Sequence, residues 1–449
     1  MNREISTIEF SEKESLLSVT HAFIYALLGI FSLTLLSGIF LAAYYVPTFT
    51  QAFSSVERLN EQVPFGWLIR RIHGTGGNFS LILMILGLLH VLFSGDYKIN
   101  SRSSWLIGIL SLFMAVVENF TGSFLPLSQS AFWGTVTILS NFATFPWVGN
   151  QLVDLLRGGK ELGGTALIRF YSIHIGISVP MAFLLFGYYW QWFRKMRVVE
   201  KNSLKHLTFL FLIAMSALLL STVTFFPHWF SDSLKETVNP MVNPERVSPP
   251  WYLLFFEETF KFFTGNYPVW SGIAFFLALL FVVSLPFMDR RPERNLLLRP
   301  MILGIGIASL AVLLYFSLLG TANARYGEKV VLPAGPLSPA EIRGAQVFAH
   351  KKCTYCHQVF GREGRREGPD MSVVRQRQRS PEWLRRYIFN SRLYRPGTTM
   401  PRYEIPLEDL EALSSYILSL DLKKGKFKTI ERDLFLDYGP FLMTQGDEQ

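Results

Sequence analysis

Charge and cysteine are both scarce in this sequence. Only 17% of its 449 residues are charged, whereas 50% are hydrophobic and 40 are phenylalanine, a balance too apolar for an ordinary soluble enzyme. Because there are only two cysteines, Cys353 and Cys356, a disulfide framework is excluded. Residues 1–15 lack the basic start, apolar run and small-residue cleavage site of a signal peptide. We therefore expect a membrane protein of several spans, targeted by its first apolar helix.

Apolar runs long enough to cross a membrane recur before residue 321. A span needs about 20 apolar residues, and seven runs qualify, at 22–45, 76–94, 104–124, 170–192, 206–226, 268–288 and 300–320. The loops after the second, fourth and sixth runs are short and basic, which makes them cytoplasmic by the positive-inside rule. The N-terminus is then cytoplasmic, and the chain beyond 320 lies on the outer side. Since these loops explain much of the net charge of +9, nucleic acid is not expected as a partner.

A heme-attachment motif lies in the polar C-terminal part. Cys353 and Cys356 are followed directly by His357, the pattern in which two thiols bond a porphyrin and the histidine ligates its iron. A zinc site would need a fourth ligand in similar spacing, and no further cysteine exists. Met400 lies 43 residues beyond His357 in a Gly/Thr/Pro loop, and its thioether is the expected sixth ligand, although a surface methionine is the alternative.

This C-terminal part resembles the small monoheme cytochrome c domains. The resemblance covers about 80 residues and rests on 345–348, on the CxxCH motif, on 368–370 and on an amphipathic helix near 410–420. It implies a covalent heme c attached outside the cytoplasm, in agreement with the topology from the charged loops. Residues 349–402 are dense in Arg and Lys, which favours an acidic electron partner, although a solvated face explains the charge nearly as well.

Two histidines, His73 and His174, lie near the ends of apolar runs. Arg70 precedes His73 by about one helical turn, where it could pair with a heme propionate, and glycines follow His73 where a flat macrocycle would lie. Residues 44–56, 63–77, 122–134, 169–174 and 249–252 closely resemble cytochrome b, the heme-bearing core of the quinol-oxidising cytochrome bc complexes. The resemblance covers about 300 residues. It implies that His73 and His174 ligate the heme b nearer the outer face, with Gly38 and Gly122 beside it.

The second heme position of that family is altered, and we call it the inner site. Cytochrome b carries another histidine about 14 residues beyond each ligand, because 14 residues rise about 21 Å and return to nearly the same helix face. Here Gly87 stands at that distance from His73, and Tyr188 and Tyr189 stand at the matching places beyond His174. Ile24 replaces a glycine expected in the first span. We expect the inner heme to be missing or differently ligated.

Two alternatives concern the same region. A rearranged inner heme could use His90 with either His21 or His206. Glu118, deep in the third span, is expensive to bury unless it faces a cavity or a partner, so it is either protonated and inert or part of a proton path.

The quinone pocket implied by the resemblance is altered as well. The family's Pro-Glu-Trp-Tyr motif, whose Glu accepts a proton from quinol, is replaced by Pro249, Pro250, Trp251 and Tyr252. Glu257, two turns later, is a candidate for a displaced proton acceptor, because a carboxylate beside an apolar pocket suits general-base chemistry. A carboxylate that simply faces water at the membrane interface is the alternative.

These observations predict an all-α protein, a bundle of about seven transmembrane helices followed by a small helical cytochrome c domain. The parts are a four-helix heme-binding part (1–205), a three-helix part with the quinone-pocket loop (206–322), a linker (323–340), the cytochrome c domain (341–421) and a charged tail (422–449).

The expected function is that of a membrane electron-transfer subunit of a quinol:acceptor oxidoreductase in a bacterial-type cytoplasmic membrane. The resemblance implies quinol as substrate, a Rieske iron–sulfur subunit as partner, a soluble or membrane electron acceptor, and a homodimer. Two other functions stay open: a quinone-linked conduit for a different redox module without splitting the electron pair, and a non-catalytic heme sensor or assembly subunit.

Overall fold

The chain forms two compact units in the computed structural model. One unit is Met1–Ser128, Gly163–Thr237 and Phe276–Val312, and the other is Gln129–Leu162, Val238–Phe275 and Leu313–Gln449. The structure describes residues 2–100, 102–143, 145–159, 162–195, 198–225, 234–240, 249–261, 269–323, 329–333, 335–360, 368–377, 379–395, 398, 400–421 and 427–437.

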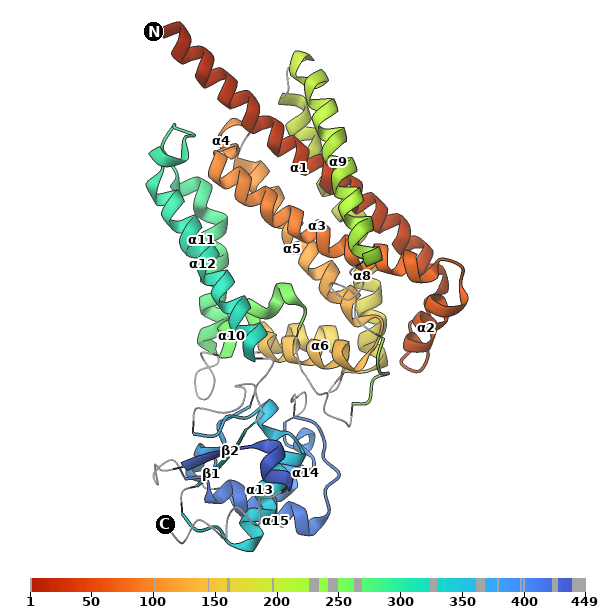
Figure 1. The fold of residues 1–449 in the computed structure, drawn as a ribbon, viewed down its shortest axis with the longest axis vertical. Helices are drawn as coiled ribbons and strands as arrows, with labels where there is room; N and C mark the ends of the chain where they lie inside the picture. The colour runs from red at the N-terminus through yellow and green to blue at the C-terminus, as the bar shows by residue number, and fades with distance from the viewer. Residues whose placement is uncertain are drawn as a thin grey trace. The chain divides into compact units, whose positions relative to one another are not determined.

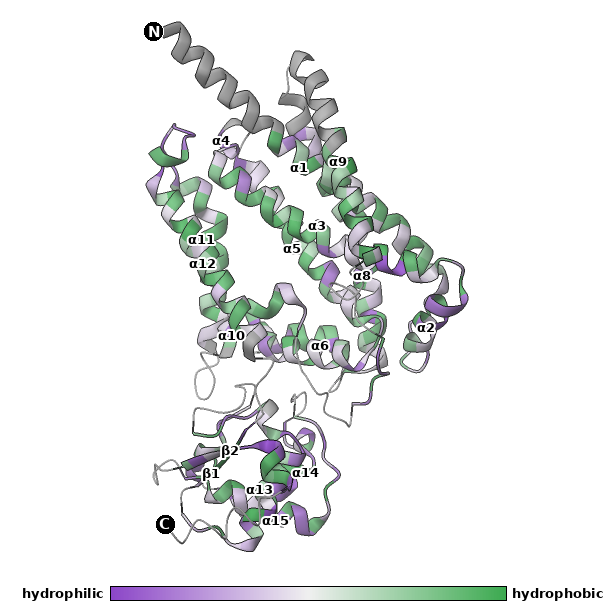
Figure 2. Ribbon diagram, in the orientation of Figure 1, coloured by the Kyte–Doolittle hydropathy of each residue, from purple (hydrophilic) through white to green (hydrophobic). Residues whose placement is uncertain are grey.

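Long helices overlap all seven predicted runs (Figure 1). They are α1 (Asn2–Tyr44), α3 (Gly66–Ser94), α5 (Arg102–Phe124), α8 (Gly164–Lys195), α9 (Val198–Phe225), α11 (Val269–Met288) and α12 (Pro300–Asn323). Within the described residues, all but α9 hold an apolar stretch of membrane-spanning length, and α9 has a shorter one at Phe211–Phe225. Hydrophobic residues dominate these helices (Figure 2), which supports the predicted fold class of an integral membrane bundle.

Four of these helices pack into the core of the first unit. Helix α1 packs against α3, α5 packs against α8, and α3 joins the two pairs by contacting α5. Backbone hydrogen bonds inside each helix satisfy the polar main chain, which an apolar membrane interior would leave without partners. The pairing brings the helices that carry the predicted ligand histidines, α3 and α8, to the two sides of one bundle.

Short helices lie in the connections between the long helices. The smaller elements before the C-terminal domain are α2 (Ala52–Gln62), α4 (Tyr97–Asn100), α6 (Gln129–Phe142), α7 (Gly149–Arg157), η1 (Trp251–Leu253), α10 (Leu254–Lys261) and η2 (Leu296–Leu298). In the second unit Phe256 contacts Phe142, Phe260 and Phe275, with ring centroids 4.4 to 5.3 Å apart. This aromatic cluster fixes α10 against α6.

A charged corner, which we call the Arg299 corner, lies between the end of α3 and the α11–α12 loop. Arg299 is only 1% exposed, yet its guanidinium donates to the carbonyls of Leu92 and Phe93 and pairs with Asp289, 3.1 Å from Nη1 to Oδ2. Tyr97 and Lys98 also donate to Asp289, with 2.9 Å from the lysine nitrogen. Burial alone would raise the pKa of Asp289, but the hydrogen bonds from Tyr97, Lys98 and Arg299 outweigh it and lower that pKa.

The C-terminal domain is a helical core closed by two strands. Its elements are β1 (Lys329–Pro333), α13 (Pro339–His350), η3 (Cys353–Tyr355), η4 (Met371–Val373), η5 (Arg375–Arg377), α14 (Pro381–Phe389), η6 (Ser391–Leu393), α15 (Leu407–Ser419) and β2 (Phe427–Glu431). A capping box formed by Ser338 and Glu341 starts α13. Helices α13 and α15 cross at Gly344, where a Cβ would collide with the backbone of Ala412.

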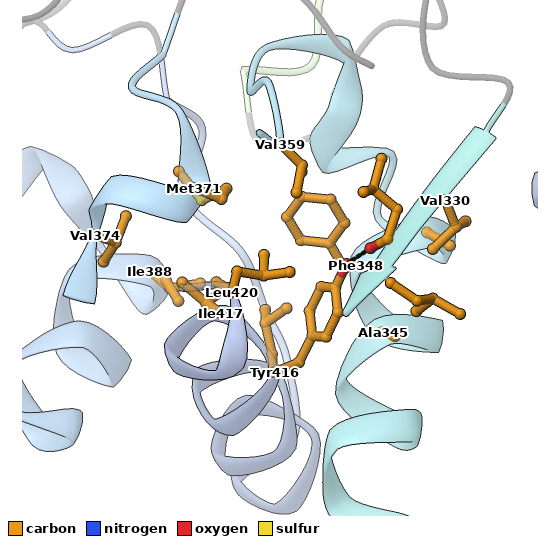
Figure 3. Close-up of a cluster of buried hydrophobic side chains, with 14 of the residues drawn as sticks. Val330, Ala345, Phe348, Val359, Met371, Val374, Ile388, Tyr416, Ile417 and Leu420 are labelled. Carbon is orange, nitrogen blue, oxygen red and sulfur yellow. Dashed lines mark hydrogen bonds between the residues drawn. The ribbon is translucent and has the colours of Figure 1, made fainter. Parts of the chain in front are cut away.

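The two strands lie in ranges that the sequence indicated as linker and tail. They pair antiparallel, Lys329 opposite Glu431 and Pro333 opposite Phe427. The Tyr416 hydroxyl of α15 donates to the Val331 carbonyl at 2.5 Å, within the cluster drawn in Figure 3. Val330, Val331 and Leu332 are thus part of the domain core, so the folded C-terminal domain begins before residue 341.

Candidate functional site

The two predicted ligand histidines face each other within the first unit. His73 lies on α3 and His174 on α8, and their ring centroids are 6.0 Å apart at an interplanar angle of 86°. A metal ion bound to one nitrogen of each ring, at about 2 Å from each, would hold two imidazoles at about this separation. The pair therefore has the spacing of two axial ligands on one iron.

Both rings are oriented by backbone carbonyls. Nδ1 of His73 lies 2.9 Å from the Thr34 carbonyl oxygen, and Nδ1 of His174 lies 2.9 Å from the Glu118 carbonyl oxygen. Since a carbonyl only accepts, each Nδ1 must carry the proton, which leaves the lone pair on Nε2 for a metal. Thr34 and Glu118 were not predicted in this role, because a backbone acceptor leaves no mark in the sequence.

Glycines leave room beside both rings. A Cβ at Gly38 would come 2.8 Å from Cε1 of His73, and one at Gly122 would come 2.7 Å from Cε1 of His174. A side chain at either position would displace a histidine ring, so both glycines keep room for the two rings. Arg70, one turn before His73, is half-buried, a position compatible with a propionate partner. The residues present fit one heme b at this outer site.

Glu118 lies beside the outer site rather than the inner one. Its carbonyl orients His174, and its Oε1 accepts a hydrogen bond from Ser178 at 2.6 Å. Ser178 stands one turn beyond His174, so the side chain and the backbone of Glu118 both join α5 to the ligand-bearing turn of α8. The hydrogen bond gives this carboxyl group the partner that a residue at membrane depth requires.

Apolar side chains occupy the inner site. Ile24 packs against Leu88 in a buried cluster that Tyr188 and Tyr189 also contact. The small cavity that remains is lined by Thr20, Phe23, Ile24, Leu27, Leu83, Met84, Gly87, Leu88, Val91, Gly108, Ser111, Leu185 and Tyr188. No histidine is among these described lining residues.

The alternative ligand His90 turns toward a polar group. Its Nε2 lies 3.9 Å from Oδ2 of Asp96, and its ring lies 5.9 Å from that of Phe23. Asp96 also accepts hydrogen bonds from Thr20 and Arg294. Of the two proposed partners, His21 is buried at 1% exposure, and the side chain of His206 lies outside the described residues.

The predicted quinone-pocket residues form one short turn and the helix after it. Pro250 precedes η1, in which Trp251 is 37% exposed and contacts Tyr252 edge to face at 5.6 Å. Glu257 follows in the first turn of α10 and is only 3% exposed, so in this structure it does not face water. Its neighbour Glu258 lies against α12, since a Cβ at Gly320 would come 3.2 Å from Cγ of Glu258.

The C-terminal motif residues converge beside the core of their domain. Cys353 and Cys356 form no disulfide with each other, and a helical turn joins them, with the Cys356 amide donating to the Cys353 carbonyl. Nδ1 of His357 lies 2.8 Å from the Pro369 carbonyl oxygen, which leaves Nε2 for iron. Met400 packs against the same core as Cys353. Two thiols, an oriented imidazole and a thioether on one core fit a covalent heme c.

Replacing Met400 with alanine is expected to lower the reduction potential of heme c and to open its sixth position to external ligands. The thioether favours the reduced iron, and alanine supplies no ligand. Redox titration and absorbance with added cyanide measure both effects. Met371→Leu is the matched control, because Met371 is buried in the same core. An unchanged potential in Met400→Ala would assign the sixth position to another residue.

Comparisons with known proteins agree with this geometry. The family model described as "Cytochrome b/b6/petB" matches residues 11–222, "Cytochrome b(C-terminal)/b6/petD" matches 237–334, and "Cytochrome c" matches 342–421. Cytochrome b of Schizosaccharomyces japonicus is 30% identical over 284 residues, covering 58% of this chain and 70% of that protein. Cytochrome b of Rhodospirillum rubrum is 29% identical over 303 residues, covering 64% and 74%.

A solved structure has a similar fold. A chain of a "Hyperthermophilic respiratory Complex III" superposes with a TM-score of 0.60 at 23% identity, covering 74% of this chain and 89% of that one. At this level of identity the likeness concerns the fold alone.

Proposed function

Because the chain belongs to the cytochrome b family and ends in a cytochrome c domain, we propose that it is the membrane electron-transfer subunit of a quinol:cytochrome c (acceptor) oxidoreductase. The observation that carries this proposal is the pairing, in one chain, of the His73–His174 clamp with the Cys353–His357 motif. Heme b and heme c, when bound, would each take up and release one electron at a time.

The chain's own residues supply three functions in this proposal. His73 and His174 hold and orient one heme b, and Cys353, Cys356, His357 and Met400 hold heme c. The turn that contains Pro250, Trp251 and Tyr252 shapes an apolar pocket for the quinol ring. Glu257 takes a quinol proton, which its buried position on α10 supports.

The partners and orientation follow from the family and from the charged loops. A Rieske iron–sulfur subunit would take the first electron from quinol, and the complex would be a homodimer in a cytoplasmic membrane. The N-terminus would be cytoplasmic and the cytochrome c domain would lie on the outer side, where it would pass electrons to an acceptor.

The residues at the inner site argue for a single heme b, held at the outer site, and favour a second candidate function. Ile24, Leu88 and Tyr188 fill the space and no described lining residue is a histidine, so a route to a quinone on the cytoplasmic side would be interrupted. This observation favours, as the second candidate, a quinone-linked b/c conduit that does not split the electron pair.

Rapid mixing of the purified complex with quinol in the presence of an oxidant pulse distinguishes the candidates. Splitting of the pair is expected to reduce heme b and heme c together, because removal of the first electron drives the second into heme b. Reduction of heme c without an oxidant-induced reduction of heme b would indicate the conduit. Failure of quinol to reduce either heme would overturn both and indicate a sensor or assembly subunit.

Glu257→Gln is expected to lower quinol turnover by on the order of 100-fold, since a positioned general base contributes about this much. The isosteric amide keeps the packing but accepts no proton. Steady-state quinol oxidation at saturating acceptor measures the effect. Glu258→Gln is the control, because Glu258 is equally buried on the same helix but lies against Gly320. Unchanged turnover in Glu257→Gln would remove Glu257 from the reaction.

A further inference from the structure

Arginine is concentrated in one stretch of the cytochrome c domain. Residues 375–402 contain a single acidic residue, Glu382, and eight arginines, namely Arg375, Arg377, Arg379, Arg385, Arg386, Arg392, Arg395 and Arg402. The next stretch, 403–421, contains five acidic residues and no basic one. Along the chain, a basic segment is therefore followed directly by an acidic one.

Aromatic rings form the centre of this segment. Trp383 and Tyr387 stack at 4.8 Å on α14, and Tyr394 contacts both rings at 5.7 and 5.8 Å. The guanidinium of Arg379 lies 4.7 Å from the centre of the Trp383 ring. Leu393 is 77% exposed and Tyr394 is 44% exposed. Trp, Tyr and Arg around an exposed apolar residue is the composition of a protein-binding hot spot.

The same segment is tied to the loop that carries Met400. The Ser391 hydroxyl donates to the Met400 carbonyl at 3.1 Å, and the Tyr403 amide donates to the carbonyl of Phe389, the last residue of α14. A protein bound over α14 and η6 would therefore lie next to the Met400 side of the heme c site. Electron transfer requires such closeness.

We infer that the face formed by α14, η5 and η6, centred on Leu393 and Tyr394, docks an acidic electron-carrier protein that exchanges electrons with heme c. Charge complementarity identifies the partner, because exposed guanidinium groups such as those of Arg377 and Arg395 match carboxylates in a two-pronged geometry. Within the described residues, Arg385 pairs with Glu411 and Arg386 pairs with Glu382. The inference rests on the proposed function, since it names the acceptor class of that electron-transfer subunit.

Stopped-flow oxidation of the full-length chain tests the inference. The chain is reduced chemically, freed of reductant, and mixed with an acidic oxidised plastocyanin as the probe. The oxidation rate of heme c is expected to fall as salt rises, because steering by charge is screened. Arg377→Gln/Arg395→Gln is expected to lower the rate about three- to tenfold at low salt, with the difference vanishing near 0.5 M salt, where the screening length is only a few ångströms.

Two controls make the result decisive. Lys329→Gln/Lys428→Gln removes the same charge from β1 and β2 and is expected to leave the rate nearly unchanged. An equal decrease of the heme c oxidation rate in both double variants, or no decrease in the arginine variant, would overturn the inference. The experiment is repeated in nanodiscs of phosphatidylcholine with and without phosphatidylglycerol. An arginine effect that appears only with the anionic lipid would assign the face to the membrane surface and overturn the protein partner.

The assay also separates this inference from the proposed function. It starts from chemically reduced heme and uses no quinol, so the docking face can be confirmed in a chain that quinol fails to reduce. Conversely, normal quinol-driven reduction of both hemes combined with salt-independent oxidation by plastocyanin would retain the function and remove the docking face.

Discussion

Heme extraction from the purified protein is expected to release one b-type heme for each covalently bound heme c. The outer site has two oriented imidazoles 6.0 Å apart and glycines that keep space beside both rings. The inner site has Gly87 and Tyr188 at the ligand positions, and Ile24 fills the space beside them. The pyridine hemochrome spectrum, compared before and after acid–acetone extraction, gives the ratio.

Single substitutions connect the extracted heme to its ligands. His174→Ala and His73→Ala are each expected to abolish the b-type heme while the covalent heme c remains. In each variant only one of the two histidines that would hold the heme b iron is left. His90→Ala is the matched control and is expected to retain the full heme b content, since Nε2 of His90 faces Asp96. Two hemes b per heme c, with one lost in His90→Ala, would instead show a rearranged inner site.

The membrane helices were predictable because a physical length is imposed on them. Each apolar run had to span the hydrocarbon core, and within the described residues six of the seven runs coincide with helices of membrane-spanning length. Their ends were not predictable, since a helix continues into polar residues once it leaves the membrane; α3 begins at Gly66, ten residues before the predicted run. The strands β1 and β2 were missed for a different reason. They pair across about 100 residues, and no local pattern links Val330 to Ile430.

The sequence identified the candidate ligand side chains of the site, but it did not show which groups orient them. His73 and His174 stood out by their context, and the structure brings them together. The groups that orient the rings could not be recognised in the sequence. They are the backbone carbonyls of Thr34 and Glu118, and every residue of a chain has a backbone carbonyl. Glu118 was recognised as unusual at membrane depth, but its partner Ser178 is 60 residues away and became visible only with the packing of α5 on α8.

The Arg299 corner shows that the role of a charged residue also depends on packing that the sequence does not reveal. In the sequence, Asp289 and Arg299 belong to a basic cytoplasmic loop, and a charge there indicates orientation. In the structure Arg299 is 1% exposed and Asp289 is 6% exposed. Arg299 supplies donors to the Leu92 and Phe93 carbonyls, which are among the last four of α3 and have no partner inside the helix. These residues thus fasten the α11–α12 loop to the end of the heme-bearing helix.

Arg299→Met is therefore expected to destabilise the folded protein by about 2–4 kcal/mol, because the buried Asp289 carboxylate keeps only Lys98 as a cation and two helix carbonyls lose their donor. The temperature at which heme b absorbance is lost in detergent measures the effect. Arg290→Met is the matched control, since Arg290 lies in the same loop and is exposed, and it is expected to change stability by less than about 0.5 kcal/mol.

Removing the carboxylate as well tests the mechanism of that loss. Arg299→Met/Asp289→Leu is expected to recover part of the stability, because the buried carboxylate that lost Arg299 is removed as well. The stability of the wild-type protein as a function of pH should show the same dependence on the Asp289 carboxylate. Since the folded pKa of Asp289 is depressed, its contribution is fully present above its unfolded pKa of about 4 and is lost as the pH falls below it. A double variant no more stable than Arg299→Met would show that the helix carbonyls, and not the ion pair, depend on Arg299.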